Sequence, residues 1–276
     1  MIKVLIFYIC YFSVVLGGET GYRFTNDKFV NDIFHIEMIT DFNQGNFNYY
    51  SNLSGRLVTE FVEKKNNNYK FLQTWNNLIS TYRRNDEMKI NHEAQKLNGT
   101  QFIINSDSTG EYTREGVGDG ATEMEEQNTA LLFFTSQENI MYPFGPDSLR
   151  LVGDTWTNHT EEHFEEFPGF EHCKADLVGD AIYTFNKVKT KKGKIIAYIS
   201  KEEEVSISML TQTWDEAWKM VVIGILNTEI QYNVTDKKFV KYRMRGTLKG
   251  DGTDLEDDSS IFFSQNMDIL CKRKLK

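Results

Sequence analysis

The sequence predicts a mainly β protein built on a large antiparallel curved sheet, arranged as a half-barrel or a sandwich, with one or two short helices. Three observations favour this class. Short apolar or alternating runs bounded by polar turns recur along the 276 residues, aromatic residues make up 13% of the chain, and it contains only 3 prolines. This composition provides enough apolar surface for a substantial core and argues against disorder.

Four hairpins are expected, because β-branched and aromatic residues flank turns rich in Asn, Asp, Gly and Lys. Their paired strands are 57–62 with 69–75, 102–104 with 111–113, 181–188 with 195–200, and 222–234 with 239–244. Residues 121–136 place apolar side chains at near-helical spacing after an acidic start, which favours a helix. Residues 213–216 have the form of a capping box, and either a helix or a continuing strand is consistent with them.

Residues 1–18 have the features of a secretory signal peptide, with Lys3, an apolar run over 4–16, and then Gly17 and Gly18 for cleavage. The run is too short to span a bilayer comfortably and no second run of spanning length follows, so no transmembrane anchor is expected. A signal anchor is the alternative. We therefore expect a secreted or extracellular protein, or a periplasmic one in a bacterium.

Residues 19–276 are expected to form a single β-rich domain. Residues 19–142 and 150–276 are candidate related halves, because in each a hairpin with a lysine-rich turn is followed by a second hairpin. The net charge of −9 disfavours nucleic acid and anionic lipid surfaces as partners.

Two cysteines, Cys173 and Cys271, remain once Cys10 leaves with the signal peptide. In an oxidising compartment they most simply pair, closing a loop of about 100 residues that would contribute on the order of 4 kcal/mol. Two unrelated thiols are the alternative.

Four Asn-X-Ser/Thr sequons predict glycosylation at surface turns if the chain passes through a eukaryotic secretory pathway. Their acceptor residues are Asn52, Asn98, Asn158 and Asn233.

His159, Glu162 and His163 match the H-x-x-E-H pattern of inverted zinc peptidases. On a helix the two imidazoles would share one face and bind Zn²⁺, while Glu162 would activate the bound water. The preceding residues 153–157 indicate a turn and a strand, and Pro168 follows soon after, so a solvated loop is the preferred interpretation. Elsewhere in the sequence, no candidate nucleophile lies beside an obvious general base. We therefore expect no enzymatic activity, no cofactor and no metal.

The four tryptophans have three possible roles, namely a sugar-stacking platform, the lining of an apolar cavity, or ordinary core packing, which is the preferred interpretation. They are Trp75, Trp156, Trp214 and Trp218.

A glycine-led strand over 99–105, a turn over 107–110, a proline at 143 or 146, and the element Gly153-Asp154-Thr155-Trp156 follow one another in the chain. This arrangement resembles a pattern in secreted, mostly bacterial, β-rich proteins and lipoproteins of unknown function. The long hairpins are also similar to those of lipoprotein-carrier half-barrels. That resemblance implies a curved antiparallel sheet that holds acyl chains.

Together these features predict a secreted, non-enzymatic binding protein whose partner is a hydrophobic small molecule or lipid held in a β-shell. An extracellular or cell-surface interaction protein with a filled core is the first alternative. A zinc-dependent hydrolase is the second.

Overall fold

The computed structural model describes residues 21–23, 32–44, 47–65, 68–84, 87–99, 101–106, 112–117, 149–165, 172–213 and 217–273. The expected signal peptide and the expected helix over 121–136 lie outside these residues. No helix within the described ranges is long and apolar enough to cross a membrane.

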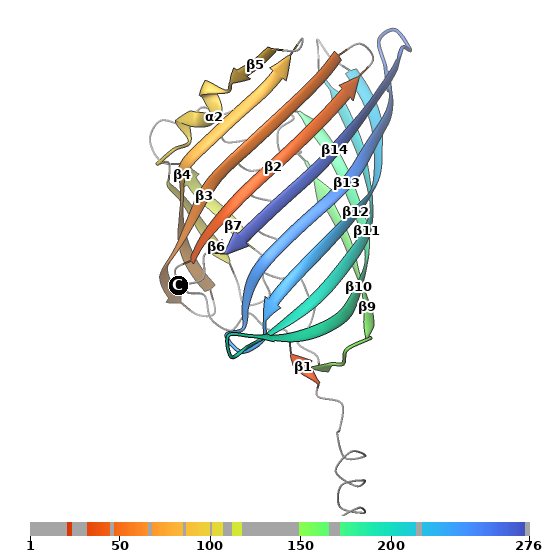
Figure 1. The fold of residues 1–276 in the computed structure, drawn as a ribbon. Helices are drawn as coiled ribbons and strands as arrows, with labels where there is room; N and C mark the ends of the chain where they lie inside the picture. The colour runs from red at the N-terminus through yellow and green to blue at the C-terminus, as the bar shows by residue number, and fades with distance from the viewer. Residues whose placement is uncertain are drawn as a thin grey trace, which may run out of the picture.

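Twelve strands within the described residues form one antiparallel sheet (Figure 1). Their order is β7-β6-β4-β3-β2-β14-β13-β12-β11-β10-β9, and β5 pairs with β4 outside this path. The strands are β2 (Asp32–Gln44), β3 (Phe47–Lys65), β4 (Asn68–Arg84), β5 (Glu87–Ile90), β6 (Gln101–Ser106), β7 (Tyr112–Val117), β9 (Thr155–Phe164), β10 (Cys173–Lys191), β11 (Lys194–Gln212), β12 (Ala217–Asn233), β13 (Lys238–Asp254) and β14 (Ser260–Arg273). The one helix in the described part of the chain is α2 (His92–Lys96).

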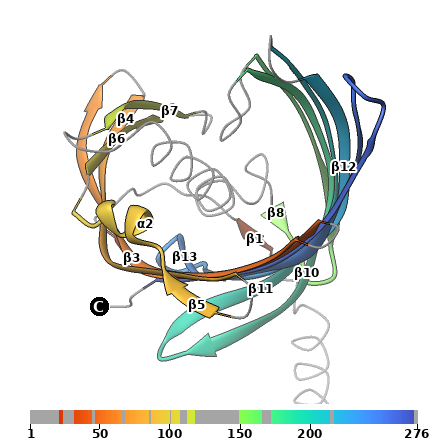
Figure 2. The same ribbon diagram turned by 90° about the horizontal axis from the view of Figure 1, so that it is seen from above.

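The sheet is open, with β7 and β9 as its edge strands. Pairing of β2 with β14 joins the strands from the beginning of the chain to those from its end. Seen from above, the sheet is curved into an open arc (Figure 2). A separate two-stranded sheet of β1 (Tyr22–Arg23) and β8 (Leu149–Arg150) lies within this curve. The open curved sheet corresponds to the half-barrel among the predicted arrangements.

Side chains alternate between two faces along the long strands, as expected for strands with one face hidden from water. On β10 the residues Ala181, Tyr183 and Phe185 are buried, while Ile182 and Asn186 between and beside them are exposed. Tyr22 of β1 packs edge-on against Phe185, with ring centroids 5.6 Å apart. The buried side chains therefore point to the inside of the curve, and we call this side of the sheet the enclosed face.

Two clusters of buried apolar side chains cover the enclosed face. The larger one includes Tyr183, Phe185, Ile230 and Tyr242. The smaller one consists of Cys173, Ala175, Met209 and Val222. The buried core is therefore interrupted between these two clusters, along the strands of the second half of the sheet. A binding site can lie at this interruption.

All four expected hairpins are confirmed, as β3–β4, β6–β7, β10–β11 and β12–β13. The β10–β11 turn consists of Lys192 and Gly193, both with positive φ (51° and 74°), as in the two-residue turns that match the twist of a hairpin. Residues 214–216 of the expected capping box lie outside the described residues, and the residues from Ala217 onward form strand β12 and not a helix. Short apolar or alternating runs bounded by polar turns were therefore a reliable guide to the strands.

The expected disulfide between Cys173 and Cys271 is wrong, because both are buried free thiols. Across the sheet, Cys173 pairs with Thr211, Thr211 pairs with Trp218, and Trp218 pairs with Asp254 on β13. Cys271 instead pairs with Tyr242, twelve residues away on the same strand. At about 3.3 Å per residue, the two thiols lie about 40 Å apart along the strands, whereas a disulfide needs Cα atoms within about 7 Å.

Candidate binding face

A row of side chains crosses the enclosed face at right angles to the strands. The cross-strand partners in this row are Trp156, Tyr183, Lys201 and Thr228. The Trp156 and Tyr183 rings are stacked, with their centroids 5.3 Å apart and an angle of 3° between the ring planes. The Arg150 guanidinium lies 4.7 Å from the centre of the Trp156 ring, and the Lys201 ammonium lies 5.7 Å from that of Tyr183. We call Arg150, Trp156, Tyr183 and Lys201 the aromatic ladder.

The turn before β9 sets the position of Trp156 in this ladder. The Gly153 N–H donates to the Phe185 carbonyl at 2.8 Å, and the Phe185 N–H donates to the Asp154 carbonyl at 2.9 Å. The Asp154 carboxylate accepts a hydrogen bond from the Leu151 N–H at 2.7 Å. The Gly153-Asp154-Thr155-Trp156 element therefore attaches the first residues of β9 to β10 and delivers an indole to the enclosed face.

Lys201 of the ladder also belongs to a group of buried or partly buried polar side chains, Lys201, Glu203, Thr228 and Tyr242, which we call the polar centre. The Lys201 ammonium and the Glu203 carboxylate form an ion pair at 2.7 Å, with side chains only 8% and 16% exposed. Burial raises the pKa of Tyr242 well above its ordinary value, an effect that the Thr228 hydroxyl opposes and the negative charge of Glu203 reinforces. Tyr242 is therefore a neutral phenol.

Placing an ion pair in an apolar interior costs desolvation energy that its Coulomb attraction does not reliably repay. A pair of well-packed apolar side chains would stabilise the fold at least as well. Stability alone therefore gives no reason for Lys201 and Glu203 to face inward, and this sets the polar centre apart from its surroundings.

Next to the polar centre, between the two buried clusters, lie five half-buried apolar side chains of the enclosed face, which we call the apolar floor. They are Val205, Ile207, Leu226, Leu248 and Met267. Leu226 and Met267 pack against the larger cluster, and Ile207 and Leu248 pack against the smaller one. The apolar floor is the part of this region where apolar side chains keep contact with solvent.

Two glycines allow leucine side chains of the apolar floor to lie close to the backbone of the sheet. Gly224 is the cross-strand partner of Leu248, and Gly246 is the partner of Leu226. A Cβ atom added at either glycine would lie 2.4 Å from the Cδ2 atom of the partner leucine. Each leucine therefore lies across a glycine instead of standing upright, which leaves room above the sheet for another apolar group.

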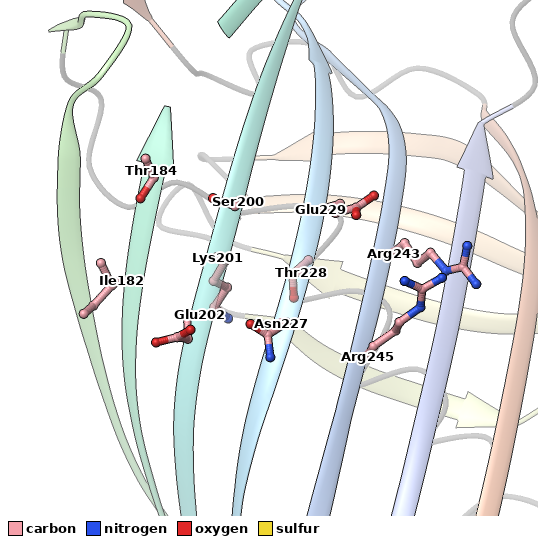
Figure 3. A pocket seen from close by; sticks show the side chains of 10 residues that line it. All are labelled: Ile182, Thr184, Ser200, Lys201, Glu202, Asn227, Thr228, Glu229, Arg243 and Arg245. Carbon is pink, nitrogen blue, oxygen red and sulfur yellow. The ribbon is translucent and has the colours of Figure 1, made fainter. Parts of the chain in front are cut away.

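The opposite face of β10–β13 carries a hollow of about 430 Å³ (Figure 3). Its wall is charged, with Glu202 and Glu229 on β11 and β12 and Arg243 and Arg245 on β13. Asp268 binds Arg243 through two hydrogen bonds of 2.9 and 2.6 Å and Arg245 through one of 3.1 Å. These arginines are therefore already paired with a carboxylate of β14.

His159, Glu162 and His163 are not brought together as a zinc site requires. They lie on strand β9, which places Glu162 on the face opposite the two histidines and separates the histidines by about 13 Å. Each imidazole instead pairs with an aspartate of β10, His159 with Asp180 at 2.8 Å and His163 with Asp176 at 2.6 Å. Among the described residues, no group of three or more His, Cys, Asp or Glu side chains is arranged to hold a metal ion.

The four sequons lie in different environments. Asn158 is exposed on β9, and Asn52 is half-buried on β3. The Asn98 amide holds the backbone of Leu78 through two hydrogen bonds. Asn233 is only 1% exposed and both of its amide atoms bond to Asp236, so a glycan at Asn233 is inconsistent with the folded structure.

Of the tryptophans, Trp75 is buried in the larger cluster, and Trp218 packs against the smaller one. Trp156 belongs to the aromatic ladder, and Trp214 lies outside the described residues.

The sequence analysis did not single out Lys201 and Glu203. The available signal was alternation, which places both charges on the same face as the apolar residues Ile199 and Val205.

No protein-family model matches the chain, and no curated protein matches it. Among solved structures, the chain is similar to OccK11 (OpdR) of Pseudomonas aeruginosa, with 5% identity over 92% of this chain and 97% of that one. The TM-score is 0.21, a value too low to carry an argument about fold or function.

Proposed function

We propose that the chain is a secreted, non-enzymatic binding protein that holds an apolar ligand of the lipid class against the enclosed face of its sheet. The observation that carries this proposal is the apolar floor, where half-buried apolar side chains lie low over glycines between two filled clusters. A curved sheet binds a ligand where its inward side chains do not fill the interior.

The driving force for such binding is removal of apolar surface from water, worth roughly 25 cal/mol per Å². A flexible acyl chain suits a floor formed by side chains from four neighbouring strands, β11 to β14, because it can follow the curvature of the sheet. The ladder and the filled clusters would provide the rigid walls on either side.

Binding of a pyrene-labelled long-chain alcohol tests this proposal. Saturable binding is expected, with displacement by unlabelled lipid and about a tenfold loss of affinity in Leu248→Asn. The matched control is Ile223→Asn, because Ile223 lies on the outer face of the neighbouring strand β12 and is 57% exposed. Absence of saturable binding, or equal losses in both folded variants, would refute the proposal.

An interaction protein is the second candidate, favoured by a strip of exposed aliphatic side chains on the outer face of β10 and β12. The strip consists of Ile182, Val221, Ile223 and Ile225. Ile223 and Ile225 of this strip also line a hollow of about 1010 Å³. If this strip is the functional surface, Ile223→Asn abolishes binding of the partner while Leu248→Asn does not.

A further inference from the structure

The Glu203 carboxylate is the more accessible member of the buried ion pair. Its side chain is 16% exposed, against 8% for Lys201. Its Oε1 atom lies 3.4 Å from the position that a Cβ atom would take at Gly179, two residues before Ala181 on β10. The Glu203 carboxylate therefore lies over the space that the missing side chain of Gly179 leaves on β10.

The charge of Lys201 is directed at groups of the protein itself. Its ammonium lies 2.7 Å from the Oε2 atom of Glu203 and 5.7 Å from the centre of the Tyr183 ring. The more accessible group of this ion pair is therefore the Glu203 carboxylate, which accepts hydrogen bonds.

The polar centre also adjoins the apolar floor. Glu203 is the cross-strand partner of Leu226, and Val205 is the next residue of β11 on the same face. Leu226 in turn pairs with Gly246, whose other partner is Met267. A hydrogen-bond acceptor thus stands at one end of a strip of half-buried apolar side chains.

We infer that the polar centre selects the head group of the bound lipid. The ligand class is a single-chain amphiphile whose head donates a hydrogen bond to Glu203, as a hydroxyl or an ammonium does, while its chain lies on the apolar floor. A carboxylate or phosphate head is disfavoured, because it has no hydrogen to donate to Glu203 and the neighbouring Lys201 ammonium is already paired with that carboxylate. This inference rests on the proposed function. It adds that the polar end of the ligand lies at the polar centre and the apolar end on the apolar floor.

Competition for the pyrene-labelled alcohol tests head-group selection. At pH 8 hexadecanol and hexadecylamine are expected to displace the probe at concentrations at least tenfold lower than hexadecanoate. In Glu203→Gln, which keeps the shape of the side chain but removes its charge, this ratio is expected to fall at least fivefold. Glu202→Gln is the matched control, because Glu202 is the adjacent residue on the outer face and should leave the ratio unchanged.

If Glu203→Gln does not fold, Glu203→Asp retains the charge and draws it back from the floor, which should lower the ratio by a smaller factor. Equal displacement by the three competitors overturns head-group selection while leaving lipid binding intact. An unchanged ratio in a folded Glu203→Gln variant does the same. Failure of every amphiphile to bind overturns the proposed function together with this inference.

Discussion

The Trp156 and Tyr183 rings lie parallel at a centroid distance of 5.3 Å, joining the edge strand β9 to β10 from the enclosed side of the sheet. The Arg150 guanidinium lies 4.7 Å from the centre of the indole, and the Lys201 ammonium lies 5.7 Å from the centre of the phenol ring. Stacked rings contribute about 0.5–1.5 kcal/mol beyond the apolar area they bury, and each cation adds to this. The stack thus gives the Gly-Asp-Thr-Trp element a structural role.

Replacing this indole should destabilise the protein. We expect Trp156→Ala to lower the free energy of unfolding by about 3–5 kcal/mol, because it removes a buried aromatic side chain and its stacking partner's contact. Denaturant unfolding followed by circular dichroism measures the change. Trp156→Phe keeps a ring against Tyr183 and should lose less than half as much. Equal losses in the two variants would mean that stacking contributes nothing.

The imidazoles of β9 should titrate above their ordinary pKa of 6.5. A hydrogen bond to Asp180 raises the pKa of His159, and one to Asp176 raises that of His163. A pKa raised by folding means that the stabilisation is complete below pH 6.5 and is lost as the pH rises through the folded value. Solvent screens both exposed pairs, so the change in melting temperature should be small.

Proton NMR titration of the two histidines checks this expectation. In Asp180→Asn and Asp176→Asn the pKa of the partner imidazole should return towards 6.5, each without affecting the other histidine. Two histidines that titrate at or below 6.5 in the unmodified protein would contradict the pairing.

The two buried cysteines should behave as unreactive thiols. Burial raises the pKa of both Cys173 and Cys271, which keeps them protonated at neutral pH. We expect slow alkylation by iodoacetamide in the native protein, rapid alkylation of both after denaturation, and the same melting temperature with and without a reductant. A peptide pair linked through these cysteines in a non-reducing digest would contradict the fold.

Glycan mapping should distinguish the four sequons when the chain is expressed through a eukaryotic secretory pathway. We expect no glycan at Asn233, because its side chain is buried and bonded to Asp236. Asn158 is exposed on the edge strand β9, so its modification is compatible with the folded structure. Efficient modification of Asn233 in folded, secreted protein would show that this turn adopts another conformation.

Local patterns in the sequence determined the strands themselves. Residues 181–188 and 195–200, for example, are rich in β-branched and aromatic side chains on either side of a lysine-rich turn, and they lie in β10 and β11 as expected. This information is local, because a strand exposes successive side chains on opposite faces wherever it lies in a sheet. The fold class and the four hairpins followed from it.

Only the tertiary structure decided which distant strands meet and where they meet. Pairing of β2 with β14 and the register from β10 to β14 place Cys173 far from Cys271, against the expectation that two cysteines would pair. The same register brings Lys201 and Glu203 beside Thr228 and Leu226. Such contacts depend on the order of strands across the sheet, which is set by the packing of the whole enclosed face and not by the periodicity of any one segment.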